Sequence, residues 1–180
     1  MQAEVLSVGT ELLLGQTVNT DTTIVAKALS ALGIDLLYAA VVGDNVGRLE
    51  KAVYDALDRS DILITTGGLG PTGDDLTKET VAAAAGKKLV LHEQSYQHLL
   101  DYFANGGMTE NQMKQAMLPE GCSTKSSWNP GSSLLYVCVD QRGKKAADGS
   151  CQTVDLFSVR AKEKEEYFRE SSWTFCSVRR

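Results

Sequence analysis

The sequence predicts an α/β fold in which a mostly parallel sheet is covered by helices on both faces. The first observation is that short apolar runs alternate with amphipathic stretches, with short links between them. The second is that the clearest apolar run, Ile62–Thr66, leads through a glycine-rich turn into a helix-forming segment from Leu76 to Ala85. Strands that each lead into a helix pair in parallel, because the helix carries the chain back to the same end of the sheet.

The first strand and helix are predicted between residues 4 and 33. Glu4–Val8 is a short apolar run, and residues 9–11 break it. Asn19 to Asp21 then supply polar N-cap side chains. Apolar residues recur at helical spacing up to Gly33, which we expect to cap the end of the helix.

The second unit has the same order. Ile34–Val42 reads as a strand, Gly43–Asn45 interrupts it, and the apolar positions between Val46 and Leu57 mark an amphipathic helix. The chain then returns to the strand Ile62–Thr66, so three strands are expected to lie in one sheet.

Two more helices are predicted beyond Gly86. Residues 87–91 form a short strand or arm, and residues 93–105 read as a helix. Thr109 caps the start of the last helix, because Gln112 follows at the spacing of a capping box. This helix ends at the turn Leu118–Gly121, after which a further strand would normally follow.

Composition limits the classes of partner. The chain of 180 residues fits one domain, and its net charge of −5 argues against nucleic acid and acidic membranes as partners. No apolar run is long enough for a membrane span, and the N-terminus shows no signal peptide. We therefore expect a cytoplasmic protein that binds a small molecule. Homo-oligomerisation stays open.

The chain divides in composition at Gly121. The part up to Gly121 has 8 basic and 16 acidic residues, whereas the rest has 10 basic and 7 acidic residues together with all four cysteines and both tryptophans. We expect residues 1–121 to form the domain and residues 122–180 to be an atypical tail that is not an independent domain.

The glycine-rich turn after Thr66 indicates an anion site. Gly67, Gly68 and Gly70 let the backbone approach a ligand, and amides beside a helix N-terminus attract phosphate. The alternative is that the glycines serve only the packing of an ordinary strand-to-helix turn.

Two acids in the predicted first turn of the next helix extend this interpretation. Asp74 and Asp75 could hold a divalent cation together with a diphosphate. Alternatively, Thr72 is the N-cap and Asp75 its partner at N3, as in a capping box. Thr10 and Glu11 follow the first strand and would reach the same crevice, unless they only cap a turn.

These stretches together resemble the N-terminal domain of the CinA (competence/damage-inducible) family, in the molybdopterin-binding superfamily of MoaB, MogA and gephyrin. The resemblance covers about the first two-thirds of the chain. It is carried by six motifs in order: Ser7–Gln16 (SVGTELLLGQ), Val18–Thr20 (VNT), Val41–Asn45 (VVGDN), Thr66–Thr72 (TGGLGPT), Asp74–Thr77 (DDLT) and Leu118–Gly121 (LPEG).

The resemblance implies a three-layer α/β/α sandwich that binds a phosphorylated nucleotide-like or pterin-like ligand at the strand ends. In the CinA branch it implies hydrolysis of the pyrophosphate of ADP-ribose with a divalent metal ion. Asp75 and Asp74 would then hold the metal or orient water. The other ligand-binding positions implied are Gly9, Thr10, Glu11, Asp44, Asn45, Gly67, Gly68, Gly70, Thr72 and Thr77. The alternatives are a molybdopterin-binding module without hydrolysis, and a non-functional truncated product.

The resemblance stops after Gly121, where the family continues with a strand and a loop containing Val-Gly-Thr. A shifted reading frame is one explanation, because codons for Lys125–Pro130 can spell Asn-Gln-Val-Gly-Thr when one base is dropped. An out-of-frame tail would leave the domain incomplete at its C-terminus, with an unpaired strand edge and impaired activity.

Overall fold

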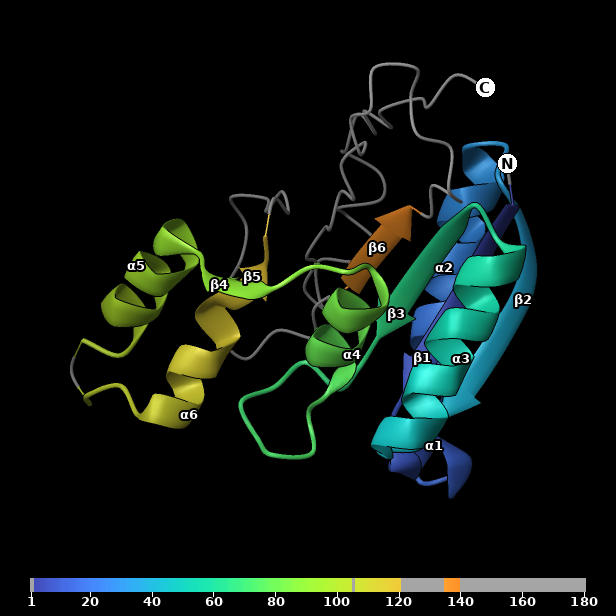
Figure 1. Cartoon of the computed structure of the whole chain (residues 1–180). Helices are drawn as coiled ribbons and strands as arrows, with labels where there is room; N and C mark the ends of the chain where they lie inside the picture. Colours follow the sequence, from blue (N-terminus) through green and yellow to red (C-terminus); the bar gives the residue numbers. More distant parts are fainter. Residues whose placement is uncertain (1, 105, 121–134, 140–180) are drawn as a thin grey trace, which may run out of the picture.

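The computed structural model describes residues 2–104, 106–120 and 135–139. Its main sheet has four strands in the order β2-β1-β3-β6 (Figure 1). The strands β1 (Gln2–Val8), β2 (Asp35–Val42) and β3 (Ile62–Thr66) are parallel, and β6 (Leu135–Val139) pairs antiparallel with β3. The predicted mostly parallel sheet is therefore confirmed.

Helices cover both faces of this sheet. In Figure 1, α2 (Thr20–Ala31) lies behind the sheet and α3 (Val46–Arg59) lies in front of it, with α4 (Thr77–Ala84) following β3. None of the helices in the described part of the chain is long and apolar enough to cross a membrane. The arrangement is the three-layer sandwich that the resemblance implies.

The alternation of side chains along β1 and β3 creates two cores. One core lies on the α2 face and consists of Ala3, Val5, Val25, Leu29, Ile34, Ile62 and Ile64. The other lies on the α3 and α4 face and consists of Leu6, Val8, Leu49, Val53, Ala56, Leu63, Leu69, Val81, Leu99 and Ala116. Because successive strand residues point to opposite faces, both central strands are buried on both faces beyond Gln2, including the polar residues Glu4, Ser7, Thr65 and Thr66.

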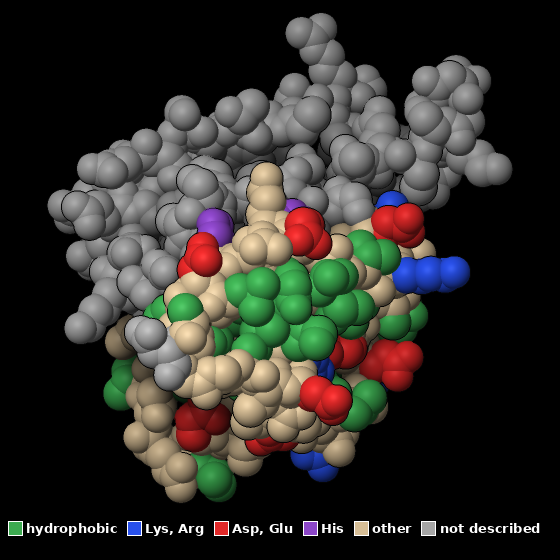
Figure 2. All heavy atoms as spheres, turned by 90° about the vertical axis from the view of Figure 1, so that its left-hand side faces the viewer, with side chains coloured by type: hydrophobic (Ala, Val, Ile, Leu, Met, Phe, Trp, Pro, Cys, Tyr) green, Lys and Arg blue, Asp and Glu red, His purple; other side chains and the backbone are tan. Residues whose placement is uncertain are grey.

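A second, smaller part follows α4. Its two-stranded sheet pairs β4 (Leu89–Leu91) with β5 (Met117–Pro119), and α5 (Glu93–Tyr102) and α6 (Glu110–Met113) lie between them in sequence. Figure 2 shows a group of hydrophobic side chains on the face of the molecule where α5 and α6 lie. This part contributes a short 3₁₀ helix, Lys114–Ala116, to the site described below.

Several predicted boundaries need correction. The helix predicted over 93–105 ends at Tyr102, and Leu32 rather than Gly33 is the C-cap of α2, with Gly33 following at φ 69°. The predicted turn Leu118–Gly121 contains most of β5, because residues 117–119 find a partner strand at 89–91, far away in sequence.

The unpaired strand edge that an out-of-frame tail would leave is not found at β3. The backbone of β6 pairs with all five residues of β3, from Ile62↔Val139 to Thr66↔Leu135. The stretch 125–130, on which the frameshift hypothesis rests, lies outside the described residues, as does the rest of the tail apart from β6.

Candidate functional site

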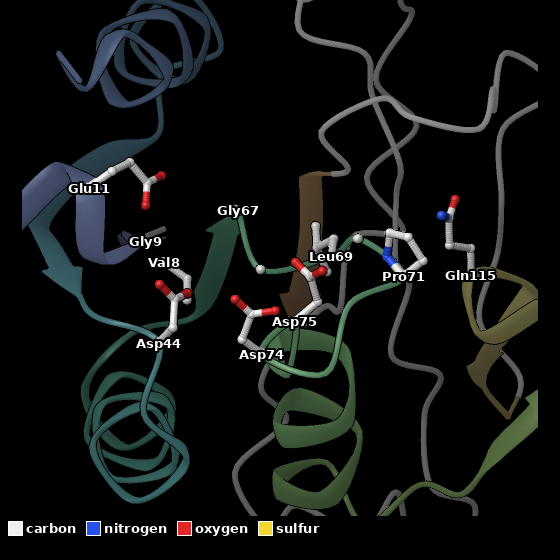
Figure 3. Close-up of a pocket in the computed structure, with 12 residues that line it drawn as sticks. Val8, Gly9, Glu11, Asp44, Gly67, Leu69, Pro71, Asp74, Asp75 and Gln115 are labelled. Atoms are coloured by element: carbon white, nitrogen blue, oxygen red, sulfur yellow. The ribbon is translucent and has the colours of Figure 1, made fainter. Parts of the chain in front are cut away.

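The turns that follow the three parallel strands meet at the carboxyl edge of the sheet and enclose a pocket of about 460 Å³ (Figure 3). Parallel strands end at the same edge, so residues distant in sequence come together there. The pocket is lined by Val8, Gly9, Glu11, Asp44, Gly67, Gly68, Leu69, Gly70, Pro71, Asp74, Asp75 and Gln115.

The glycines of the turn after β3 are required by close packing. Gly67 and Gly68 have φ values of 83° and 63°, a region that other residues rarely adopt. A Cβ at Gly67 would collide with the backbone oxygen of Val8, and one at Gly68 with the hydroxyl of Thr77. Packing therefore requires glycine at both positions, and a role of the turn in ligand binding stays a prediction.

The amides of this turn have no acceptor among the described residues. Within the described part of the chain, the N–H groups of residues 67–70 donate to no backbone or side-chain acceptor. The backbone oxygens of Gly67 and Gly68 do accept hydrogen bonds. The Thr77 hydroxyl donates to the Gly67 oxygen at 2.9 Å, and the Thr77 amide donates to the Gly68 oxygen at 3.1 Å. Thr77 is fully buried and positions the turn without lining the pocket.

The two acids lie in the loop before α4 and not in its first turn. This helix begins at Thr77, and its N-cap, Leu76, offers no side-chain hydrogen bond. The carboxylate of Asp75 accepts from the Thr72 amide at 2.9 Å and also from the Thr72 hydroxyl. The expected capping box is therefore wrong as a helix cap. Its residues close a separate turn, in which the Asp75 amide donates to the Thr72 oxygen at 3.3 Å.

Asp74 lies within this turn, and the pKa of its carboxyl is lowered. The Thr72 side chain is the largest cause that lowers the pKa of Asp74, followed by the backbone amide of Asp74, with the charge of Lys114 acting in the same direction. Because Thr72 has a single hydroxyl proton, its bond to Asp75 competes with this first cause, while the backbone amide of Asp74 and the charge of Lys114 still lower the pKa. Asp74 is thus kept as a carboxylate over the physiological pH range.

The opposite wall is fixed by reciprocal hydrogen bonds between the turns after β1 and β2. The Thr10 amide donates to Asp44 Oδ2 at 2.8 Å, and the Asp44 amide donates to Thr10 Oγ1 at 3.0 Å. Thr10 therefore positions Asp44, and of these two residues Asp44 lines the pocket whereas Thr10 does not. Asn45 does not line it either, because Asn45 caps α3 by accepting from the Arg48 amide at 3.1 Å.

The charge of the pocket is one-sided. Of the lining residues in the described part of the chain, four are acidic, Glu11, Asp44, Asp74 and Asp75, and none is a lysine or arginine. In Figure 3, Asp44 and Asp74 stand on facing sides of the space below Gly67. Among the residues that the structure describes, no three His, Cys, Asp or Glu side chains are close enough to hold a metal ion by themselves.

Sequence reasoning missed four lining residues. Val8 and Leu69 flank predicted positions and could have been found as the neighbours of Gly9 and Gly68. Pro71 lies in the motif Thr66–Thr72, but a proline in a turn is ordinary and does not by itself indicate a ligand. Gln115 carries no local signal, because it reaches the pocket from the short helix Lys114–Ala116.

Sequence comparisons agree with this architecture. A family model described as "Probable molybdopterin binding domain" matches residues 4–137. A "Putative competence-damage inducible protein" of Acetivibrio thermocellus is 55% identical over 146 residues, which are 80% of this chain and 35% of the relative. A "CinA-like protein" of Desulfovibrio desulfuricans is 58% identical over 121 residues, which are 67% of this chain and 28% of the relative. The chain thus spans about a third of the length of these relatives.

Solved structures show the same fold. A structure titled as the protein CinA with unknown function, from Thermoplasma acidophilum, has a TM-score of 0.72 and 25% identity over 92% of this chain and 91% of that one. The molybdopterin biosynthesis enzyme MoaB from Thermus thermophilus has a TM-score of 0.53 and 15% identity over 94% and 87% of the two chains. At this identity the second likeness shows the fold alone.

Proposed function

Because the chain belongs to the molybdopterin-binding-domain family and its relatives include CinA-like proteins, we propose that it binds a small phosphorylated nucleotide in this pocket. The reaction proposed is hydrolysis of the pyrophosphate of ADP-ribose or a related nucleotide, as the resemblance to CinA implies. The names of the relatives do not state this activity, so it has to be tested directly.

One observation carries the proposal: amides without a described acceptor line the same pocket as four carboxylates, with no lysine or arginine among the described lining residues. Amides beside the N-terminus of α4 attract phosphate oxygens. Four carboxylates repel them unless a cation lies between, since like charges a few ångströms apart in a half-enclosed site cost energy. The pocket therefore suits a phosphate that carries a divalent cation.

The carboxylates of Asp74 and Asp75 suit a divalent cation that is shared with the phosphates of the ligand. Magnesium is commonly held by one or two carboxylates together with substrate phosphates and water, and so does not need three protein ligands. The Asp75 carboxylate is held by both the amide and the hydroxyl of Thr72, whereas Asp74 faces Asp44 across the pocket and keeps its charge because its pKa is lowered. We assign Asp74 as the principal metal ligand, with Asp75 beside it.

The remaining residues would divide binding and orientation between them. Gly67, Gly68 and Gly70 would bind phosphate through their amides, and Thr72 and Thr77 would hold the loop that carries these glycines. Gly9, Glu11 and Asp44 would contact the ligand from the opposite wall, and a carboxylate there can accept a hydrogen bond from a ribose hydroxyl or orient water. The bound metal would offset the charge on the pyrophosphate oxygens.

Incubation with ADP-ribose and Mg²⁺ or Mn²⁺ tests the proposal. AMP and ribose 5-phosphate should appear, and removal of the metal with a chelator should stop their formation. Asp74→Asn should lower kcat/KM by about a hundredfold, because a neutral amide binds the cation poorly. Asp58→Asn, a matched change on the exposed surface of α3, should leave kcat/KM unchanged. Turnover that survives both chelation and Asp74→Asn would refute the metal assignment.

A second candidate follows from the family description itself. A molybdopterin-binding module would bind a pterin phosphate in this pocket without cleaving it. Saturable molybdopterin binding with no release of AMP from ADP-ribose would favour this second function. Absence of both would favour a non-functional product.

The charge of the chain bears on its partners and on its location in the cell. A net charge of −5 disfavours nucleic acid and acidic membranes as partners, and we propose a cytoplasmic location. A fractionation in which the protein stays with nucleic acid or membranes would contradict this.

A further inference from the structure

We propose that Lys114 is a positioning residue of the pocket, which holds the loop of Asp74 and Asp75 in place from behind. It lies in the short 3₁₀ helix Lys114–Ala116, 39 residues after Asp75 in sequence. Its effect on turnover rests on the proposed function, whereas its effect on the loop does not.

The Lys114 ammonium group is bonded to the backbone of that loop. It donates to the Asp75 oxygen at 2.9 Å and to the Thr72 oxygen at 3.2 Å. It also lies 3.4 Å from the Glu79 carboxylate on the first turn of α4. These partners stand at the two ends of the Thr72–Asp75 turn and at the start of the following helix, so one cation fixes all three relative to one another.

A second lysine holds Lys114 in turn. Lys78 is almost fully buried, and its ammonium group donates to the backbone oxygen of Lys114 at 2.5 Å. The two lysines therefore join the two segments in both directions. Lys78 of α4 bonds the backbone of the 3₁₀ helix, and Lys114 of the 3₁₀ helix bonds the backbone of the loop before α4. Bonds from charged donors to carbonyl oxygens are stronger than those from neutral ones.

The same short helix also forms part of the pocket wall. Gln115, next to Lys114 in sequence, lines the pocket, and Figure 3 shows it on the far side from Glu11. A shift of the 3₁₀ helix would therefore move a pocket wall and release the acid loop together. Lys114 lies outside the lining and its bonds are to backbone oxygens, so it acts through the loop and not on the ligand.

Amide hydrogen exchange of the full chain without ligand tests the proposal. The Thr72 and Asp75 amides, which are bonded within the turn, should exchange about tenfold faster in Lys114→Met. Lys114→Arg, which can still donate to both carbonyls, should recover most of the protection. Lys27→Met, an equal change of charge on the exposed surface of α2, should leave these amides unchanged.

A second readout separates this inference from the proposed function. If the chain hydrolyses ADP-ribose, Lys114→Met should lower kcat/KM by about tenfold and Lys114→Arg should restore it. Faster exchange in a chain without any hydrolysis would support the role of Lys114 and refute the hydrolase. Unchanged exchange at Thr72 and Asp75 would overturn the positioning role, whether or not the chain is active. If Lys114→Met does not fold, Lys114→Gln is measured in its place against the same two outcomes.

Discussion

At the scale of single residues, Gly67 shows how strongly the turn after β3 depends on one missing side chain. Gly67→Ala should destabilise the chain by about 1–3 kcal/mol, because the left-handed backbone is unfavourable for alanine and the Val8 oxygen occupies the space of the Cβ. Urea unfolding measures this free energy. Gly73→Ala is the matched control: nothing lies within 4 Å of its added Cβ, so its effect should stay within about 0.5 kcal/mol.

Lys78 should make stability depend on alkaline pH. Burial lowers the pKa of its ammonium group below the ordinary 10.5, and the charge of Lys114 acts in the same direction, against Glu79 and Asp75. Between the lowered pKa and 10.5 the unfolded chain binds more protons than the folded chain, so the free energy of unfolding should rise as pH rises through this interval.

Urea unfolding of wild type and Lys78→Met over a pH series up to 10.5 checks this prediction. The rise should be absent in Lys78→Met, which has no group to titrate there. Lys27→Met should keep it, because Lys27 is exposed. An identical slope in wild type and Lys78→Met would show that another group is responsible.

At the scale of elements, the capping box of α6 is the clearest local signal that the structure confirms. Thr109 accepts from the Gln112 amide at 3.4 Å, and the Gln112 side chain accepts from the Thr109 amide at 2.7 Å. Thr109→Ala should cost about 0.5–2 kcal/mol of stability by urea unfolding. Thr23→Ala, at an exposed position within α2, should cost almost nothing. Equal effects of the two changes would mean that the cap does not stabilise the fold.

Elements were predictable where the signal is local. The bounds of β3 agree with the apolar run Ile62–Thr66, and Asn19, one of the three predicted N-cap candidates, accepts from the Thr22 amide at 3.2 Å. Residue spacing gave a wrong prediction where a helix cap and a loop turn have the same spacing. Thr72 and Asp75 have the spacing of a helix cap, yet they close a turn in the loop before α4.

The rest of the site depends on contacts between distant segments. Asp44 meets Thr10 across 34 residues and Lys114 meets Asp75 across 39, and no periodicity in the sequence reports such pairs. Asn45 and Thr77 lie in motifs of the resemblance, but a motif does not distinguish a residue that touches a ligand from one that holds the turn. Ligand-binding roles at the site residues therefore stay predictions.

At the scale of the whole molecule, β6 completes the main sheet by covering the edge of β3. A chain that ends at Glu120 lacks this strand, whereas one that ends at Val139 keeps it. The shorter chain should be less stable by about 3 kcal/mol or more, since it loses a full ladder of backbone hydrogen bonds and exposes a buried edge. Comparing the urea unfolding of the two chains measures the difference, and equal stability would mean that β6 contributes nothing to the fold.

The strand order β2-β1-β3 has a consequence for how the molecule acquires its pocket. Gly9, Asp44 and Gly67 follow three different strands, so none of the walls meets another until the non-local parallel pairings have formed. Such pairings are slow because long loops must close first. In refolding followed by stopped flow, ligand-binding competence should therefore emerge with the last kinetic phase, well after the helices have gained their circular dichroism.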